Sequence, residues 1–146
     1  MVNFRKITED NFDSIIKMKR PDGESFVASN AVSLAQAWLY RDDGDVFPFA
    51  IYDDDTVVGF MLLEEDMEDE RLDLWRIMLP PENEGKGYGT AAVKLMIQYA
   101  KESGRYKSIG LLCGTKNYNA RHIYDKLGFQ PTGEICYGDV EMRLEL

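Results

Sequence analysis

The chain has 146 residues, of which 45% are hydrophobic and 12% aromatic, so we expect one domain spanning 1–146 with its own core. Its two cysteines, Cys113 and Cys136, are far apart and have no histidine cluster beside them, which argues against a metal centre or a secreted disulfide scaffold and favours the cytoplasm. A net charge of −9 argues against nucleic acid as a partner, and the sequence contains neither an apolar run of 18 residues nor a leader-like N-terminus, which argues against a membrane protein.

The first half of the chain predicts a strand, two helices and an antiparallel meander of three strands. In order, these are a strand at 2–7, a helix capped by Thr8 and ending near Met18, a helix capped by Ser25 and covering 26–39, and strands at 47–52, 56–65 and 71–79. The segment PDGES at 21–25 separates the two helices.

The second half predicts two further strand and helix alternations and a final hairpin. A helix runs from about Tyr88 to Ser103 and ends at Gly104, and a strand follows at 107–113. A helix over 117–128 is closed by Gly128, and two last strands lie around Gly138-Asp139. The order β-αα-βββ-α-β-α-ββ predicts a mixed α/β sheet.

Acidic residues are concentrated in one part of the chain. Residues 42–73 contain thirteen acids, and Arg71 is the only base among them. Most of these acids are explained by hairpin turns and a solvated surface. The same field would also attract a small cationic ligand.

The stretch LPPENEGKGYGTAAVKLM, residues 79–96, lies between a strand and a helix and has glycines at Gly85, Gly87 and Gly89. A helix N-terminus with flexible backbone in front of it is suited to an anion. It matches neither the Walker A pattern nor the dinucleotide fingerprint, because Thr90 stands where the third glycine of that fingerprint belongs. A simple connector is the alternative, but three glycines cost roughly 2–3 kcal/mol of chain entropy relative to alanine, which favours a pyrophosphate cradle.

Two motifs resemble those of a known family. The segment LWRIMLPPENEGKGYGTAAV resembles the acetyl-CoA-binding motif of the GNAT superfamily of N-acetyltransferases, (Gln/Arg)-x-x-Gly-x-(Gly/Ala), with Gly87 and Gly89 at the small positions. NYNARHIYDKLGF resembles the second signature of that family, carried here by Asn117, Ala120, Tyr124, Lys126, Gly128 and Phe129. The segment SFVASNAVSLAQA, followed by WRIM and GKGYG, resembles bacterial spermine/spermidine (diamine) acetyltransferases.

This resemblance implies the acyl-CoA N-acyltransferase fold, a mostly antiparallel sheet with helices on both faces, and acetyl-CoA as cosubstrate without a metal. It assigns cosubstrate contacts to Ile77, Met78, Leu79, Glu84, Gly85, Lys86, Gly87, Tyr88, Gly89, Thr90, Asn117, Ala120, Tyr124 and Lys126. Glu84 departs from the motif, which has Gln or Arg at this position. A carboxylate there repels a pyrophosphate by about 1 kcal/mol or more at the surface. Binding is expected to survive if this side chain points away, and Lys86 and Lys116 partly offset its charge.

The chemistry requires an amine, with a pKa near 10.4, to lose a proton before it attacks the thioester, and the oxyanion and the thiolate then need donors. The resemblance assigns these roles to the backbone N–H of Met78 and to Tyr124 as general acid. By periodicity alone, Tyr124 belongs to an apolar helical stripe and to the core. His122 projects from another face and is interpreted as a surface residue, and Cys113 as a small buried hydrophobe.

The resemblance implies direct transfer, in a ternary complex, to a primary amine of a polyamine such as spermidine or spermine. Because dimers are common among the proteins that the chain resembles, a homodimer is a candidate assembly. Candidate acceptor contacts are Asp22, Glu24, Asp73, Trp75, Trp38 and Tyr40, although solvated surface explains any one of the acids and core packing explains Trp75. A peptide or protein, a sugar amine and an amino acid remain alternative acceptors. A degenerate module that binds CoA without turnover is the alternative outside catalysis.

Overall fold

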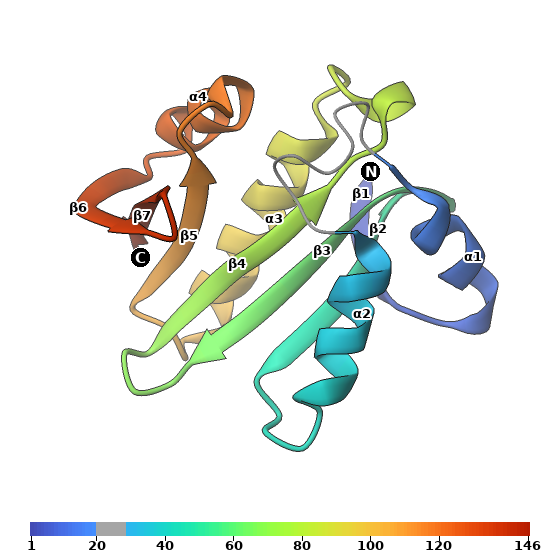
Figure 1. The fold of residues 1–146 in the computed structure, drawn as a ribbon, viewed down its shortest axis with the longest axis horizontal. Helices are drawn as coiled ribbons and strands as arrows, with labels where there is room; N and C mark the ends of the chain where they lie inside the picture. Colours follow the sequence, from blue (N-terminus) through green and yellow to red (C-terminus); the bar gives the residue numbers. More distant parts are fainter. Residues whose placement is uncertain (20–28) are drawn as a thin grey trace.

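The structure is a computed structural model that describes residues 1–19 and 29–146. In these residues, seven strands form one sheet with the spatial order β1-β2-β3-β4-β5-β7-β6 (Figure 1). The strands are β1 (Val2–Lys6), β2 (Val46–Asp53), β3 (Thr56–Asp66), β4 (Arg71–Met78), β5 (Ser108–Gly114), β6 (Gln130–Cys136) and β7 (Asp139–Glu145). Every neighbouring pair is antiparallel except β4 and β5, which run parallel.

Helices cover both faces of the sheet. The helices α1 (Glu9–Lys17) and α2 (Asn30–Leu39) pack on one face, and α3 (Tyr88–Ser103) and α4 (Tyr118–Lys126) pack on the other (Figure 1). A short 3-10 helix, η1 (Pro81–Asn83), lies between β4 and α3. The predicted mixed, mostly antiparallel sheet with helices on both faces is confirmed.

The core has two layers, one on each side of the sheet. Along β3, Met61 and Leu63 pack beneath α3, whereas Phe60 and Leu62 pack beneath α1 and α2. Because both faces of this strand are buried, its sequence is a continuous apolar run rather than an alternating one.

Local signals set most of the helix ends. Thr8 precedes α1 and its N–H donates to the Asn11 side chain at 2.9 Å, which satisfies one of the donors at the start of the helix. Gly104 ends α3 with φ at +67°, and Gly128 follows α4 with φ at +97°, both in the left-handed region that favours glycine. These three predicted boundaries are confirmed.

Several strand and helix ends differ from the prediction by one or two residues, and two of the differences have a clear local cause. Ser25, the predicted cap of the second helix, and residues 26–28 lie outside the described residues, and α2 is described from Asn30 onward. Ser29 is its cap, since its Oγ accepts from the Val32 N–H at 3.2 Å. The last hairpin turns at Tyr137 and Gly138, one residue earlier than predicted, because both have positive φ, 53° and 83°, and Asp139 already belongs to β7.

Candidate active site

The site begins where β4 and β5 stop pairing. The parallel ladder joins Arg71–Leu74 to Ser108–Leu111 and ends there, although β4 continues to Met78 and β5 to Gly114. Figure 1 shows the two strands diverging toward the edge of the sheet where α4 and the β4–α3 loop lie. The facing edges of both strands therefore carry backbone N–H and C=O groups that no ladder satisfies.

A β-bulge in β4 coincides with the end of that ladder. Leu74 lies opposite Leu63 of β3, and Arg76 lies opposite Leu62, so Trp75 is an extra residue. Leu74 packs on the α3 side, whereas Trp75 packs on the α2 side and Arg76 donates hydrogen bonds to α2. The bulge thus turns two consecutive side chains toward α2.

The loop after β4 is shaped by its glycines. Gly85 and Gly87 have φ values of 75° and 84°, and a Cβ placed on either would meet nothing within 4 Å. Gly87 caps α3 without any side chain, and the first N–H bonded inside the helix is that of Ala91, which donates to the Gly87 carbonyl at 3.0 Å. The N–H groups of the preceding helical residues are therefore available to an anion, and the loop fits a pyrophosphate.

Gly89 has a different role from the other two loop glycines. It lies inside α3, and a Cβ there would sit 3.3 Å from Cδ1 of Leu79, so a small residue lets the helix approach the end of β4. Asn83 fixes the other side of the loop by donating from Nδ2 to the Val58 carbonyl at 3.0 Å.

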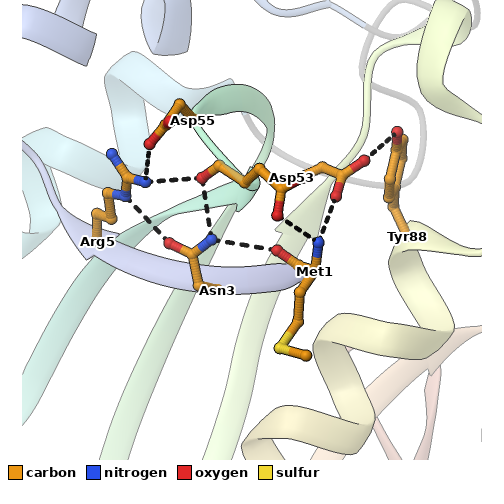
Figure 2. Close-up of polar contacts among 7 residues, drawn as sticks. Met1, Asn3, Arg5, Asp53, Asp55 and Tyr88 are labelled. Carbon is orange, nitrogen blue, oxygen red and sulfur yellow. Dashed lines mark hydrogen bonds and ion pairs between the residues drawn. The ribbon is translucent and has the colours of Figure 1, made fainter.

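A hydrogen bond ties the loop to the far end of β2. The Tyr88 hydroxyl, on the first residue of α3, donates to the Asp53 carboxylate at 3.0 Å (Figure 2). Asp53 also accepts from the Met1 amino group at 3.0 Å, and these two donors lower the pKa of its carboxyl group. The bond to Asp53 raises the pKa of the Tyr88 phenol, so the donor remains protonated at neutral pH.

A cavity of about 750 Å³ occupies the opening between β4 and β5. It brings together three segments that are far apart in the sequence: the end of β4, the loop with the start of α3, and the end of β5 with α4. The predicted cosubstrate residues that line it are Ile77, Leu79, Glu84, Gly85, Gly87, Tyr88, Gly89, Thr90, Asn117, Ala120 and Tyr124. Lys86 and Lys126 are exposed and do not line it, and Met78 has a fully buried side chain on the α1 and α2 side, so only its backbone can act there. The roles of these three residues stay predictions.

Asn117 has a structural role at the start of α4. Its Oδ1 accepts from the Ala120 N–H at 3.4 Å, so the side chain caps the helix while it also lines the cavity. The predicted contact of Asn117 with the cosubstrate stays a prediction.

Tyr124 is buried and its side chain lines the same cavity. Its ring packs edge-on against Phe129, with centroids 5.8 Å apart, and within the described part of the chain its hydroxyl has no hydrogen-bond partner. Burial, and secondarily the neighbouring Cys113, raises the pKa of the phenol well above its usual value. The group therefore keeps its proton at neutral pH, which a general acid requires.

Cys113 and His122 lie where the sequence predicted. Cys113 is buried, its Sγ lies 3.7 Å from the Gly114 carbonyl oxygen, and burial raises the pKa of its thiol. His122 is exposed on α4 and does not line the cavity. Neither residue is therefore arranged as a nucleophile and base pair.

Trp75 and Arg76 line the cavity at the α2 side. The Arg76 Nη1 donates to Ser33 Oγ at 3.1 Å and to Gln36 Oε1, and its guanidinium lies 4.8 Å from the centre of the Trp75 ring. Tyr40 reaches the other side of Trp75, with ring centroids 6.4 Å apart. Burial lowers the pKa of Arg76.

The other predicted acceptor contacts lie apart from this wall. Asp73 accepts from Arg71 Nε at 2.7 Å, in a cluster that also contains Asp66 and Asp69, and it does not line the cavity. Trp38 is 67% exposed and carries Arg41 stacked at 3.7 Å. The remaining two predicted residues, Asp22 and Glu24, lie outside the described residues. The acceptor roles of these four residues stay predictions.

Sequence reasoning missed residues that shape the site. Arg76 lines the cavity, and the signal for it was a charged residue within the apolar run LWRIML. Gly59 was also missed, although a glycine inside the apolar run of β3 is unusual; a Cβ there would lie 2.8 Å from the Met78 carbonyl oxygen. The partnership of Asp53 with Tyr88 had no sequence signal, because the two residues are 35 positions apart.

In the described part of the chain, no helix combines the length and apolar character needed to cross a membrane. Within 1–19 and 29–146, no group of three or more histidine, cysteine or acidic side chains is arranged to hold a metal ion.

Comparison with known proteins identifies similar chains. The Bacillus subtilis (strain 168) spermine/spermidine N(1)-acetyltransferase is 28% identical over 153 aligned positions, which cover 99% of both chains. The solved structure of Vibrio cholerae spermidine N-acetyltransferase in complex with CoA and spermine matches with a TM-score of 0.76 and 18% identity, covering 99% of this chain and 95% of that one. The PaiA N-acetyltransferase of Thermoplasma acidophilum, in complex with coenzyme A, matches with a TM-score of 0.75 and 19% identity over 100% and 99% of the two chains.

The structural matches establish the fold, and the match to a family model establishes the family. The model of the acetyltransferase (GNAT) family matches residues 12–129, which include the glycine loop, the opening between β4 and β5, and α4. The chain therefore belongs to the acetyltransferase (GNAT) family and is an acetyl-CoA-dependent N-acetyltransferase.

Proposed function

We propose that this protein transfers the acetyl group of acetyl-CoA directly to a primary amine of a polyamine, such as spermidine or spermine, within a ternary complex. The observation that carries the proposal is the opening between β4 and β5. At one end it has the loop before α3, whose N–H groups can bind an anion, and at the other the buried, protonated phenol of Tyr124. The names of the similar Bacillus and Vibrio proteins support a polyamine as the acceptor.

The loop and the strand edge position the cosubstrate. N–H groups at the start of α3 bind the pyrophosphate, and the edge of β4 at Ile77–Leu79 binds the pantetheine chain and the acetyl group. The resemblance to the family assigns the oxyanion that forms on the acetyl carbonyl to the backbone N–H of Met78. Glu84 lines the loop, and its carboxylate is the one feature of the cradle that opposes a phosphate.

Tyr124 completes the transfer. The neutral amine attacks the acetyl carbonyl, the carbon–sulfur bond breaks, and the Tyr124 hydroxyl gives its proton to the departing thiolate. The amine loses its proton to water or to an acid of the acceptor side, and Tyr124 regains a proton from solvent. The place of Tyr124 in the wall of the cavity supports this role, because its hydroxyl is protonated at neutral pH and has no hydrogen-bond partner among the described residues.

The surroundings of Cys113 support direct transfer over an acyl-cysteine intermediate. An acyl-enzyme requires a thiolate, and burial raises the pKa of this thiol, which disfavours that form. The one histidine of the chain, His122, is exposed on α4 outside the cavity, so it does not activate the thiol.

The charge of the chain supports a cationic acceptor. The thirteen acids between residues 42 and 73 attract a polyamine from solution. Within the described residues, eight of them form ion pairs, with the Met1 amino group, Arg5, Arg71, Arg105 or Lys107, so only part of this charge is neutralised. The expected cytoplasmic location and a homodimer remain proposals; a related Vibrio structure is described as dodecameric.

The test has two steps. Acetyl-CoA and CoA are each expected to raise the melting temperature, and spermidine with acetyl-CoA is expected to release free thiol and form acetylspermidine, detected by mass spectrometry. Stabilisation by CoA without thiol release for any amine in a panel of polyamines, peptides, sugar amines and amino acids would contradict catalysis. Turnover of another class of amine, without turnover of spermidine or spermine, would contradict the polyamine as acceptor.

A further inference from the structure

Arg76 is a cation in the wall of the cavity, and the groups that hold it among the described residues are neutral. Its Nη1 donates to Ser33 Oγ at 3.1 Å and to Gln36 Oε1, and its Cζ lies over the Trp75 ring, 4.8 Å from the ring centre. The two hydrogen bonds use one corner of the guanidinium. They fix its orientation and leave the edge formed by Nε and Nη2 without a partner among the described residues.

No described carboxylate forms an ion pair with Arg76. Helix α2 carries no charged residue between Asn30 and Leu39, and Leu62 lies opposite Arg76 on β3. The nearest acid on its own strand, Asp73, is engaged by Arg71 at 2.7 Å. Among the described residues that line the cavity, Arg76 is the single positive side chain. Burial lowers its pKa, as expected for a charge that its surroundings compensate poorly.

A partly buried guanidinium with an open edge is suited to a carboxylate. Its two parallel N–H donors match the two oxygens, and the pair is strengthened by exclusion of water. Removing a cation from water without a counter-ion is unfavourable, so a ligand that supplies the anion recovers that loss.

Building on the proposed acetyl transfer, we propose that Arg76 binds the carboxylate of a second kind of acceptor, so that the site acetylates, beside polyamines, amines that also carry a carboxylate, such as the diamino acids lysine and ornithine. Arg76 and Met78 lie two residues apart on β4, and the Arg76 side chain reaches Ser33 and Gln36 of α2. Lysine and ornithine carry a terminal amine five and four carbon atoms from the carboxylate, so both are suitable probes.

Lysine and cadaverine test the proposal, because the two molecules differ only in the carboxylate. The value of kcat/KM with saturating acetyl-CoA is expected to be at least tenfold higher for lysine than for cadaverine. In Arg76→Gln this ratio is expected to fall at least tenfold. The ratio of 6-aminohexanoate to pentylamine, which have a single amine each, is expected to change in the same direction.

The matched control is Arg41→Gln, which removes another arginine stacked on a tryptophan, but one at the exposed end of α2 outside the cavity. Its lysine to cadaverine ratio is expected to equal that of the parent. Each ratio is measured within one protein, so a loss of folded protein cancels. Arg76→Lys, which keeps the charge without the planar fork, serves as a second variant and is expected to give an intermediate ratio.

The inference is overturned if the parent acetylates cadaverine as well as lysine, or if its preference for lysine survives in Arg76→Gln. Either result leaves the proposed acetylation of polyamines intact. Failure of spermidine, cadaverine and lysine alike to release thiol would overturn both proposals.

Discussion

The two halves of β4 belong to one continuous strand but differ in the strands with which they pair. The first half, Arg71–Leu74, is bonded to β3 on one side and to β5 on the other, and Arg71 binds three carboxylates there. The second half, Trp75–Met78, is bonded to β3 and borders the cavity on its other side. A strand that is satisfied on both edges is scaffold, whereas the edge that pairing leaves open supplies backbone groups to a ligand.

Two buried tyrosines repeat this contrast. Tyr106, beside the paired half, donates its hydroxyl to Glu65 at 2.6 Å. Tyr124, beside the open half, has no hydrogen-bond partner for its hydroxyl in the described part of the chain. The difference separates a hydroxyl that stabilises the fold from one that is available for chemistry.

Replacing each tyrosine by phenylalanine gives the largest expected effect. Tyr124→Phe keeps the ring and is expected to lower kcat at least tenfold, since a general acid contributes roughly 10²–10⁴-fold in rate. Its melting temperature and its KM for acetyl-CoA are expected to change little. Tyr106→Phe is expected to keep kcat and to lose about 1–3 kcal/mol of stability, because the Glu65 carboxylate loses a donor.

Steady-state kinetics and thermal unfolding of both variants measure this contrast. Equal kcat in the parent and in Tyr124→Phe would return Tyr124 to a purely structural role. The pH profile adds a second check: burial raises the pKa of Tyr124, so the proton is held through mildly alkaline pH. We therefore expect no loss of kcat from this group below the ordinary tyrosine pKa of about 10.

The glycines at the two ends of α3 give the next largest effect. Gly87 and Gly104 both have positive φ, 84° and 67°, and both have open space where a Cβ would be. Valine at either position is strained, so Gly87→Val and Gly104→Val are expected to lose comparable stability. The KM for acetyl-CoA is expected to rise at least tenfold in Gly87→Val alone, because only that end of the helix faces the cavity.

Initial rates at varied acetyl-CoA concentration, with melting temperatures for both proteins, distinguish strain from lost binding. If KM rises equally in both variants, the effect comes from the helix as a whole, and the assignment of the pyrophosphate to the loop is wrong.

Sequence patterns predicted the elements and the loop because these depend on local signals. Glycines at 85, 87, 104 and 128 stand at turns and helix ends, and the apolar runs of the strands define the sheet. The second signature brought Tyr124 to attention although its periodicity alone indicated core.

What the sequence did not predict depends on contacts between distant segments. The bulge at Trp75 follows from the register between β3 and β4, and it turns Arg76 toward Ser33 and Gln36 of α2. The bond between Tyr88 and Asp53 joins α3 to β2. The periodicity within one element carries no information about such pairs. The sequence therefore could not predict which residues Arg76 contacts.

Hydrogen exchange of backbone amides, with and without saturating CoA, tests the central claim that the open half of β4 and the loop bind the cosubstrate. We expect exchange of the Ile77–Leu79 and Tyr88–Thr90 amides to slow at least tenfold when CoA binds. The Arg71–Leu74 amides, already paired on both sides, are expected to change little beyond any overall stabilisation. Slower exchange confined to other segments, or unchanged exchange along Ile77–Leu79 while CoA is bound, would contradict the account.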